Sequence, residues 1–545
     1  MFTHSIPADE CASLKTIYIE LQLLGMSNVC VFLDNRAKAD PDMIAIIHPA
    51  GEKTYTYHEL ASAVHHMSGG LIAQGISVGD RVVIFLDSSP EYLISYFAIW
   101  RVGGVVVPTN IVYKENELLY ILRDSQATAI ICDAAHENFV EKLLPDAPTL
   151  QMIIITGSTP KSSPKVVSWE QLAVSKPLLE PISCNLDTLC QIQYTSGTTG
   201  TPKGAMLTHG GWIVALDNEC DILDLVRGDM YLGIYPMGHV GLSWGISVLK
   251  AGGTYILLER FDPERYLSLI EQYQVTVLAS MPPVIHMLTE APSNTEERMK
   301  TVRVLISGGG PLHSPTWKRF HTRYNRPIVN AYGLSETIVL GAGTAIRPYH
   351  YRTADEYNSV GTPVGYTEVC IVDLDNPEKH LSDGEVGEIA LRGPGLALGY
   401  WNRPVESQEI FLSDGWFLTG DIGYLDSDGM LVITDRKKDM IIMSGWKIYP
   451  TEVEEALIHH PKISEVAVFG CPDEEKGEIP VVAVVLTEGV TEFLHDELVT
   501  YAKEHLAGYK VPRKTYITSQ LPRVNGWKLL RGELRDLLCN TTDTC

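Results

Sequence analysis

The chain has 545 residues, of which 45% are hydrophobic and 20% charged, and its formal net charge is −24. This length is several times that of a typical domain of roughly 100–200 residues, so we expect at least two domains, and the composition excludes collagen, coiled coil and wholesale disorder. The negative charge, with no stripe rich in Lys and Arg to offset it, argues against nucleic acid as a partner.

The first residues lack the basic region and the small-residue cleavage site of a signal peptide, and no apolar run reaches the roughly 18–20 residues of a membrane span. The most apolar stretch, 93–112, is interrupted by Arg101 and Pro108. The ten cysteines show no CxxC and no metal-ligand spacing, which favours a reducing cytosol, so we expect a cytoplasmic protein without a membrane span. Residues 1–25 precede the regular pattern described next and are either an appended helix or a mis-assigned start.

Strand and helix signals then alternate along most of the chain. In order they predict a helix from Tyr57 to Leu71, a turn at 75–80, a buried strand at 81–86, a helix at 89–101, a strand at 105–107, a helix at 115–124 and strands at 129–132, 304–307 and 328–331. The polar segment 157–165 is typical of a surface loop. Such alternation predicts an α/β fold of parallel-rich sheets flanked by helices, with ligands beyond the carboxyl ends of the strands.

From about Asp435 the pattern changes to a small α+β unit. The run Thr451-Glu-Val-Glu454 predicts a capping box that opens a helix ending before Pro461, and two strands at 466–469 and 481–486 and a helix at 492–507 follow. We therefore expect a large N-terminal domain over residues 1–435 and a small C-terminal domain over residues 436–545.

A loop rich in glycine and hydroxyl groups follows the strand-like run 191–194. It reads Thr195-Ser-Gly-Thr-Thr-Gly-Thr-Pro-Lys-Gly204. Such a loop turns tightly and directs N–H and O–H donors at phosphate oxygens, with Lys203 as the counter-charge. It is not a Walker A loop, because Pro202 stands where that pattern has glycine. A polar turn would explain a few of these residues but not all of them.

The loop resembles the signature of the adenylate-forming superfamily, which contains acyl-CoA synthetases, luciferases and peptide-synthetase adenylation domains. The resemblance runs from about residue 28 to 535. It implies an enzyme that activates a small carboxylic acid with ATP, with Mg²⁺ as cofactor and CoA as acceptor, and it allows a homodimer. The implied nucleotide site includes Thr195, Ser196, Gly197, Thr198, Thr199, Gly200 and Lys203 of the loop, and Gly308, Gly309, Gly310 and Pro311 of a glycine turn beside the adenine.

The segment Asn330-Ala-Tyr-Gly-Leu-Ser-Glu-Thr337 resembles the family's second motif. By resemblance Tyr332 stacks on adenine beside Gly333, and Thr337 contacts the α-phosphate. Glu336 and Thr198 are the implied ligands of Mg²⁺, a hard cation that takes oxygen ligands. Without the resemblance, a serine followed by a glutamate would indicate only an ordinary capped helix start.

Later motifs complete the resemblance. Asp421 resembles the aspartate that accepts both ribose hydroxyls, a task for a bidentate carboxylate, and Arg436 resembles the ribose-contacting arginine. Lys438 stands at the family's hinge between the two domains. On the CoA side, Gly445 would leave room for the pantetheine arm and the basic pair Lys510 and Arg513 would contact CoA phosphates.

Lys528 aligns with the family's catalytic lysine, which bridges the incoming carboxylate and the α-phosphate. The family usually has glycine directly before that lysine, whereas this chain has Gly526-Trp527-Lys528. Either Lys528 still reaches the phosphate with Trp527 packed outside, or the loop is altered and adenylation is slowed. Because the lysine is present, we expect activity.

The acyl group is expected beside the segment 235–244, which resembles the family's pocket-lining segment, with His239 near the substrate carboxylate as a catalytic candidate alongside Lys528 and Lys203. An aromatic residue commonly precedes that histidine, so Gly238 predicts an enlarged or reshaped cavity. The apolar Val240, Leu242 and Trp244, with no acidic residue among them, favour a hydrophobic acid over an amino acid. Aromatic, alicyclic and medium-chain acids all fit.

Three functions stay open. The first is an AMP-forming acyl-CoA synthetase. The second is an adenylating enzyme that passes the acyl group to a carrier protein or to oxygen, against which Gly445 argues. The third, motivated by Trp527, is a protein that senses adenylates without turnover. The presence of Lys528 and Gly445 leads us to prefer the first.

Overall fold

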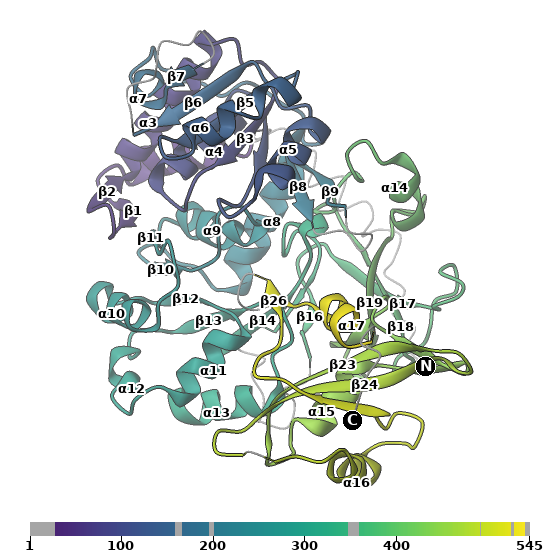
Figure 1. The fold of residues 1–545 in the computed structure, drawn as a ribbon. Helices are drawn as coiled ribbons and strands as arrows, with labels where there is room; N and C mark the ends of the chain where they lie inside the picture. The colour runs from purple at the N-terminus through teal and green to yellow at the C-terminus, as the bar shows by residue number, and fades with distance from the viewer. Residues whose placement is uncertain are drawn as a thin grey trace.

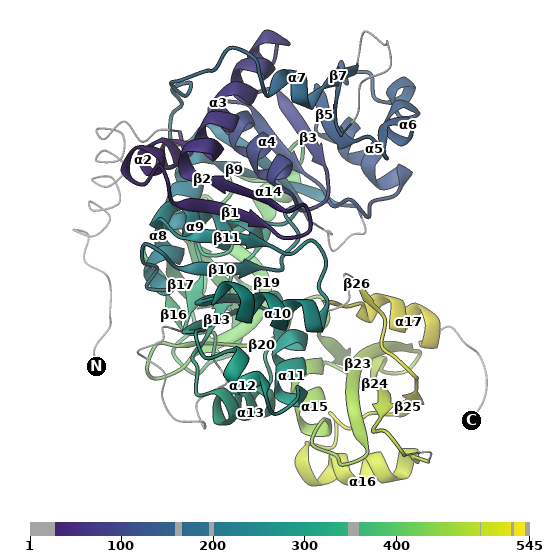
Figure 2. The same cartoon turned by 90° about the vertical axis from the view of Figure 1, so that its left-hand side faces the viewer.

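The computed structural model describes residues 28–157, 166–195, 201–346, 359–490, 492–524 and 528–539 (Figure 1). Within this part of the chain, a large domain with three sheets comes first, and a smaller domain with a five-stranded sheet and a two-stranded hairpin follows. Figure 2 shows the small domain beside one end of the large one, with strand β26 (Arg523–Val524) at their junction.

The first sheet of the large domain has nine strands in the order β16-β15-β14-β13-β12-β10-β11-β1-β2. Its central strands, from β14 to β1, run parallel. The bounds are β1 Ile44–His48, β2 Lys53–Thr56, β10 Met230–Gly233, β11 Thr254–Leu257, β12 Val277–Ser280, β13 Val304–Ser307, β14 Ile328–Tyr332, β15 Thr344–Ala345 and β16 Thr362–Pro363.

The second sheet has seven strands in the order β7-β6-β5-β3-β4-β8-β9 and is parallel except for its last pair. The bounds are β3 Arg81–Phe85, β4 Val105–Pro108, β5 Ala129–Asp133, β6 Met152–Thr156, β7 Val166–Ser168, β8 Leu189–Thr195 and β9 Lys203–Thr208. The third sheet is antiparallel and consists of β17 Glu368–Val372, β18 Gly387–Arg392, β19 Phe417–Leu425 and β20 Leu431–Arg436.

One hydrophobic core fills the space between the two large sheets. Four helices contribute to it with fully buried side chains, among them Leu60, Trp100, Trp212 and Ile246. These helices are α3 Tyr57–Ala73, α4 Pro90–Arg101, α8 His209–Ile222 and α9 Ser243–Ala251. Helices on both faces explain why a strand such as β3 is a continuous apolar run, because both of its faces are buried.

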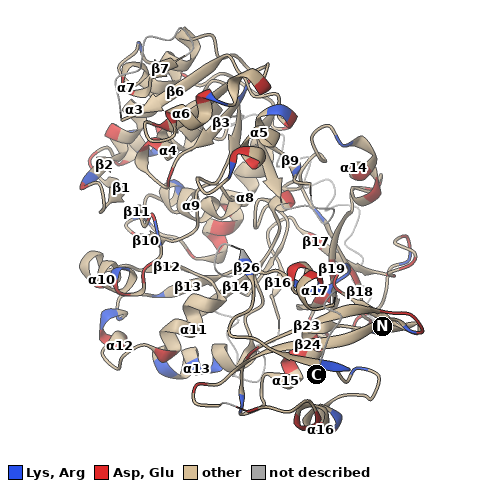
Figure 3. Ribbon diagram, in the orientation of Figure 1, with Lys and Arg blue, Asp and Glu red and all other residues tan. Residues whose placement is uncertain are grey.

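The remaining helices of the large domain cover the outer sides of the sheets and the loops (Figures 1 and 2). They are α2 Val31–Ala39, α5 Glu115–Asp124, α6 Glu137–Glu141, α7 Trp169–Leu172, α10 Pro263–Tyr273, α11 Pro282–Glu290, α12 Thr295–Arg298, α13 Ser314–Tyr324 and α14 Pro404–Ile410, with short 3₁₀ turns η1 Leu144–Asp146, η2 Val240–Leu242 and η3 Ser335–Thr337. In Figure 3 acidic and basic residues are interspersed along these elements. No helix among the described residues has the length and apolar character needed to cross a membrane.

The small domain has its own hydrophobic core. Its sheet contains β21 Ile441–Met443, β22 Trp446–Ile448, β23 Ile463–Asp473, β24 Gly477–Leu486 and β25 Lys514–Ile517, and it is accompanied by α15 Pro450–Leu457, α16 His495–His505 and α17 Arg531–Cys539. The hairpin of β26 and β27 (Lys528–Leu529) precedes α17. The expected α/β class, with a large sheet domain followed by a small α+β domain, is confirmed.

Most predicted elements occur within one to three residues of their expected bounds, and 115–124 and 304–307 match at both ends. Two details were wrong. Helix α15 begins at Pro450 with Tyr449 as its N-cap, so Thr451 lies inside the first turn and makes no capping box; its N–H donates to Asp435 instead. Strand β24 begins at Gly477, not at 481, and β23 runs on to Asp473, not 469.

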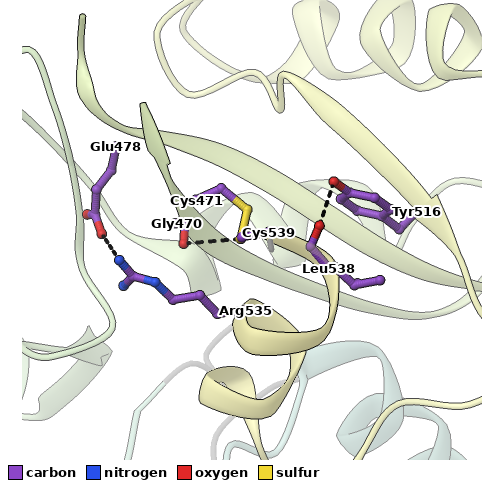
Figure 4. The surroundings of a disulfide bond; sticks show 7 residues. All are labelled: Gly470, Cys471, Glu478, Tyr516, Arg535, Leu538 and Cys539. Atoms are coloured by element: carbon purple, nitrogen blue, oxygen red, sulfur yellow. Dashed lines mark hydrogen bonds and ion pairs between the residues drawn. A yellow bond between two sulfur atoms is a disulfide. The ribbon is translucent and has the colours of Figure 1, made fainter. Parts of the chain in front are cut away.

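Two of the ten cysteines, for which the sequence offers no pairing signal, form a disulfide. Cys471 of β23 is bonded to Cys539, the last residue of α17 (Figure 4). Nearby, Arg535 pairs with Glu478 at 3.1 Å and the Tyr516 hydroxyl donates to the Leu538 carbonyl at 3.0 Å. The carboxyl end of helix α17 is thus fixed to strand β23 of the same domain.

Breaking this link is expected to destabilise the small domain. The bond closes a loop of sequence separation 68, and such a cross-link contributes about 2–4 kcal/mol by restricting the unfolded chain. Cys539→Ser should therefore unfold at lower temperature than the parent under non-reducing conditions, and the difference should vanish in dithiothreitol. Cys370→Ser, which changes a free thiol, is the control; an equal loss of stability there would contradict the prediction.

Candidate active site

The predicted nucleotide residues lie at the carboxyl ends of strands of the large domain. Thr195 ends β8, Gly308 follows β13, and Tyr332 ends β14. The turn from Gly308 to Pro311 is open: a Cβ on Gly310 would meet nothing within 4 Å, and Gly309 has a left-handed φ of 81°. This is the edge at which open α/β sheets bind ligands.

Lys203, Tyr400 and Glu336 form one cluster. The antiparallel pair of β8 and β9 places Thr195 opposite Lys203. The Lys203 ammonium lies over the Tyr400 ring, 5.3 Å from its centroid, and the Tyr400 hydroxyl donates to Glu336 Oε1 at 2.7 Å. Tyr400 therefore contacts a cation through its ring face and a carboxylate through its hydroxyl.

Tyr400 was missed at the sequence level. Its contact with Glu336 joins residues 64 positions apart, and nothing in its local sequence marks it. Glu336 is 7% exposed, and this burial raises the pKa of its carboxyl, while the Tyr400 hydroxyl and Arg436 oppose the rise. A buried carboxylate of this kind is a suitable oxygen ligand for a cation.

A second cluster joins the third sheet to β14. The Tyr332 hydroxyl donates to Asp421 Oδ2 at 2.8 Å, and Arg436 Nε lies 3.0 Å from Asp421 Oδ1. Asp421 and Arg436 face each other across the β19–β20 pair. Burial raises the Asp421 pKa, and the guanidinium of Arg436 opposes the rise. The charges of Asp421 and Arg436 also act on the pKa of Glu336.

The turn after Tyr332 contains Thr337, the residue expected at the α-phosphate. Thr337 is fully buried, and its Oγ1 accepts from the Leu334 N–H at 2.8 Å and donates within the turn, to the Val339 carbonyl at 2.9 Å. Its hydroxyl is therefore committed to the turn. Ser335 is half-buried and precedes Glu336.

Gly333 is required where this turn closes. A Cβ there would lie 1.7 Å from the Val339 carbonyl oxygen, so no other residue fits. Ile338 and Val339 adopt left-handed φ values of 48° and 53°, which are unfavourable for β-branched residues. Strain of this kind concentrates at functional sites.

The segment between the domains carries Lys438 in an exposed turn, between the end of β20 at Arg436 and the start of β21 at Ile441. Asp435 links the end of β20 to the first turn of α15, because its carboxylate accepts the N–H groups of Arg436 and Thr451, both at 2.7 Å. Burial raises the Asp435 pKa to about 6.

The residues expected on the CoA side do not meet the nucleotide clusters. Gly445 lies at the exposed tip of the β21–β22 hairpin with φ 83°, a conformation that the two-residue turn itself requires, and a Cβ there would meet nothing within 4 Å. Lys510 pairs with Glu452 at 2.5 Å, and Arg513 is exposed, with its guanidinium on the Gly508 carbonyl at 3.2 Å.

Some of the predicted residues lie outside the described part of the chain. They are Ser196, Gly197, Thr198, Thr199 and Gly200 of the phosphate loop, Gly526 and Trp527, and the side chain of Lys528. The backbone of Lys528 is described and pairs with Val524 in the hairpin at the domain junction.

Gly238, which is expected to enlarge or reshape the acyl cavity, lies against the backbone of another segment. A Cβ on it would lie 2.5 Å from the Thr109 carbonyl oxygen, so glycine is needed for a close approach of two backbones. His239 is half-buried and occupies the N-cap position of η2. An acidic residue does lie behind this segment: Glu219 of α8 is fully buried and accepts from the hydroxyls of Ser243 and Ser247 at 2.5 and 2.7 Å.

Two family models match the chain. One, described as AMP-binding enzyme, matches residues 33–401, and the other, described as AMP-binding enzyme C-terminal domain, matches residues 452–526. The chain belongs to this family. By family it is an AMP-forming acid–CoA ligase of the adenylate-forming superfamily, an enzyme class that uses ATP and CoA.

Relatives of this AMP-binding enzyme align over nearly its whole length. The feruloyl-CoA synthase of an Amycolatopsis species is 34% identical over 503 residues, covering 92% of this chain and 97% of the relative. The long-chain-fatty-acid–CoA ligase of Bacillus subtilis (strain 168) is 32% identical over 555 residues, covering 94% and 95%. The solved structure of ATP-bound MatB from Rhodopseudomonas palustris has a TM-score of 0.86 at 28% identity, covering 94% and 99%.

Glu219 gives this AMP-binding enzyme a pH-dependent stability. Burial raises its pKa to about 8 from an ordinary 4.5, so the folded state keeps a proton that the unfolded state releases above pH 4.5. Stability from this group is complete below pH 4.5 and is lost as the pH rises toward 8. Glu219→Gln should therefore gain stability relative to the parent across this interval, by a few kcal/mol at most.

Chemical unfolding at pH 5 and pH 8 measures this difference. Glu504→Gln, at an exposed position of α16, is the control and should show no pH-dependent gain. A gain for Glu219→Gln that is equal at both pH values would contradict a titrating Glu219.

Proposed function

We propose that this enzyme activates a hydrophobic carboxylic acid, aromatic, alicyclic or medium-chain, with ATP and transfers the acyl group to CoA. The observation that carries the proposal is the pair of clusters in which Lys203 lies on Tyr400, Tyr400 donates to Glu336, and Asp421 receives Tyr332 and Arg436. This arrangement offers a cation and a metal-binding carboxylate for phosphates, together with an Asp–Arg pair for ribose.

In the first step a carboxylate oxygen of the acid attacks the α-phosphorus of ATP, and pyrophosphate leaves. Anion meets polyanion here, so positive charge must be supplied where negative charge develops. We assign this task to Lys203 and Lys528, with the hydroxyl of Ser335 in place of Thr337 at the α-phosphate. His239 borders the acid's carboxylate.

Mg²⁺ suits the residues present, because it commonly binds through one or two carboxylates together with substrate phosphates. Glu336 would hold it, with Thr198 of the phosphate loop beside it, and the ion would neutralise charge on the phosphates. Tyr400, which donates to Glu336 Oε1, would orient that carboxylate.

In the second step the CoA thiol attacks the acyl carbon, and AMP leaves. A thiol with a pKa near 8.5 is already partly ionised at neutral pH, so no strong base is needed. We assign the change between steps to a hinge at Lys438 that brings Gly445, Lys510 and Arg513 to the site. Lys510 would then have to leave Glu452.

Acid-dependent exchange between pyrophosphate and ATP tests the first step, and CoA-dependent AMP release tests the second. Relatives are named for acids as different as ferulate and long-chain fatty acids, so the panel should vary in size. We expect exchange with a subset of hydrophobic acids and AMP release when CoA is added. Exchange with no acid would overturn the proposal, and acyl-AMP that accumulates unchanged with CoA would favour another acceptor.

A further inference from the structure

Arg531 fastens the start of α17 to two other elements of the small domain. It is the first residue of the helix and follows strand β27, Lys528–Leu529, after one residue. Its Nη2 donates to both carboxylate oxygens of Glu454 on α15, at 2.8 and 2.6 Å. Its Nε donates to the carbonyl of Val468 on β23 at 3.2 Å. The chain is therefore anchored three residues after Lys528.

Glu454 takes part in a closed ring of hydrogen bonds with Arg531 and Val468. Glu454 is 7% exposed, and its Oε1 also accepts the Val468 N–H at 2.7 Å. Both backbone polar groups of Val468 are thus used, its N–H by the carboxylate and its carbonyl by the guanidinium. A longer contact of 3.7 Å joins Arg531 Nη1 to Asp439 in the turn between the domains. Charge-assisted bonds of this kind are strong and fix the geometry of their partners.

Helix α15 connects this ring to the large domain. In its first turn the Thr451 N–H donates to Asp435 of β20 at 2.7 Å, and Thr451 lies three residues before Glu454. Asp435 stands next to Arg436, which pairs with Asp421. Contacts therefore run from the Asp421–Arg436 pair through α15 to the start of α17.

The hairpin that carries Lys528 needs such an anchor. Its strands β26 and β27 have two residues each and place Lys528 opposite Val524, at the domain junction (Figure 2). An isolated two-stranded hairpin is marginally stable at best in water. On the β26 side Arg523 pairs with Glu465 at 2.6 Å, but this ion pair is exposed, and water screens it. The firmer attachment is on the β27 side, through Arg531.

We propose that Arg531, held by Glu454, is a positioning residue for the adenylation step and fixes the hairpin of Lys528 relative to the Asp421–Arg436 pair. The inference rests on the proposed function, which assigns Lys528 to the α-phosphate. Arg531 acts through Lys528 and not on the substrate. A displacement of about 1 Å in a group that stabilises charge can cost roughly 100-fold in rate. Thiol attack on the acyl carbon does not use Lys528, so the two half-reactions should respond differently.

Arg531→Gln and Glu454→Gln, made in the full chain, test the inference. Each removes one charge of the pair, and Glu454→Gln keeps an oxygen to accept the Val468 N–H. We expect kcat for acid-dependent pyrophosphate exchange to fall about 10- to 100-fold with the KM for ATP unchanged, because ground-state binding is not altered. Thioester formation from supplied acyl-AMP and CoA should keep the parental rate. Arg531→Lys, which keeps the charge but not the fixed fork of donors, should retain more exchange than Arg531→Gln.

Arg535→Gln is the matched control. Arg535 lies one turn later on the same helix and pairs with Glu478 of β24 at 3.1 Å, so its loss should change neither rate. Thermal unfolding shows which variants fold; if Arg531→Gln does not, Glu454→Gln carries the test. A purely structural role would lower both half-reactions together. That result, or parental exchange in a folded Arg531→Gln or Glu454→Gln, would overturn the inference and leave the proposed function intact. Exchange with no acid in the parent would overturn both.

Discussion

Lys528→Ala is expected to lower the rate of acid-dependent pyrophosphate exchange by about 100- to 1,000-fold, the loss typical when one group that stabilises developing charge is removed. The substituted side chain would no longer supply positive charge between the incoming carboxylate and the α-phosphate. Thioester formation from supplied acyl-AMP and CoA should be spared, because the thiol attacks the acyl carbon and not phosphorus, and the resemblance places Lys528 at the α-phosphate in the adenylating step. Both rates are measured on the full chain with the same acid.

Lys503→Ala, near the end of helix α16 in the same small domain, is the control and should change neither rate. An equal loss of both half-reactions in Lys528→Ala would contradict a role confined to adenylation. The same pair of assays addresses Trp527. If Trp527 distorts the loop, Trp527→Gly should raise the exchange rate without changing the thioester step.

Glu336→Gln is expected to reduce pyrophosphate exchange by a similar factor of about 100 and to weaken its dependence on Mg²⁺ concentration. The amide keeps the size of the side chain and the hydrogen bond from Tyr400, but it removes the negative charge that would hold the ion. Because burial raises the Glu336 pKa, the parent activity should also fall toward acid from a higher pH than an ordinary glutamate would cause. That acid limb should be absent in Glu336→Gln.

Tyr400→Phe tests how much the Glu336 carboxylate depends on the hydrogen bond that it receives. It removes the hydroxyl that donates to Glu336 Oε1 and keeps the ring beneath Lys203, so we expect a loss of only a few-fold. A loss in Tyr400→Phe as large as in Glu336→Gln would show that orientation, not charge, is what Glu336 contributes. Exchange rates titrated with Mg²⁺ at pH 6, 7 and 8 distinguish these outcomes.

The alternating pattern of the chain predicted the fold class because each element carries its own signal. Strand β3 is apolar on both faces and helix α5 begins at a lysine–glutamate step, and both were recognised at nearly the observed bounds. The predicted capping box at Thr451 was wrong because a contact with a distant residue decides the start of this helix. The Thr451 N–H is taken by Asp435, a residue 16 positions earlier, and Pro450 had already started the helix.

In the candidate site, too, local motifs predicted some features and contacts between distant residues decided others. Motif order along the chain was enough to select Lys203, Glu336, Asp421 and Arg436, and the structure places these four residues in two contact clusters. A linear motif does not reveal that the Thr337 hydroxyl bonds within its own turn. That contact depends on how the chain folds back at Val339.

By itself, then, the sequence determined the succession of elements, the two-domain plan and the family of the enzyme, since these follow from local periodicity and from motifs contiguous in the chain. Only the tertiary structure decided which groups meet. Packing brings distant parts of the chain together in several places. Examples are the Tyr400–Glu336 hydrogen bond, the Cys471–Cys539 disulfide and the close approach of Gly238 to Thr109. The ring of Tyr235 likewise packs on Gly241. Such contacts are fixed by the shape of the folded core, and a short stretch of sequence carries no record of them.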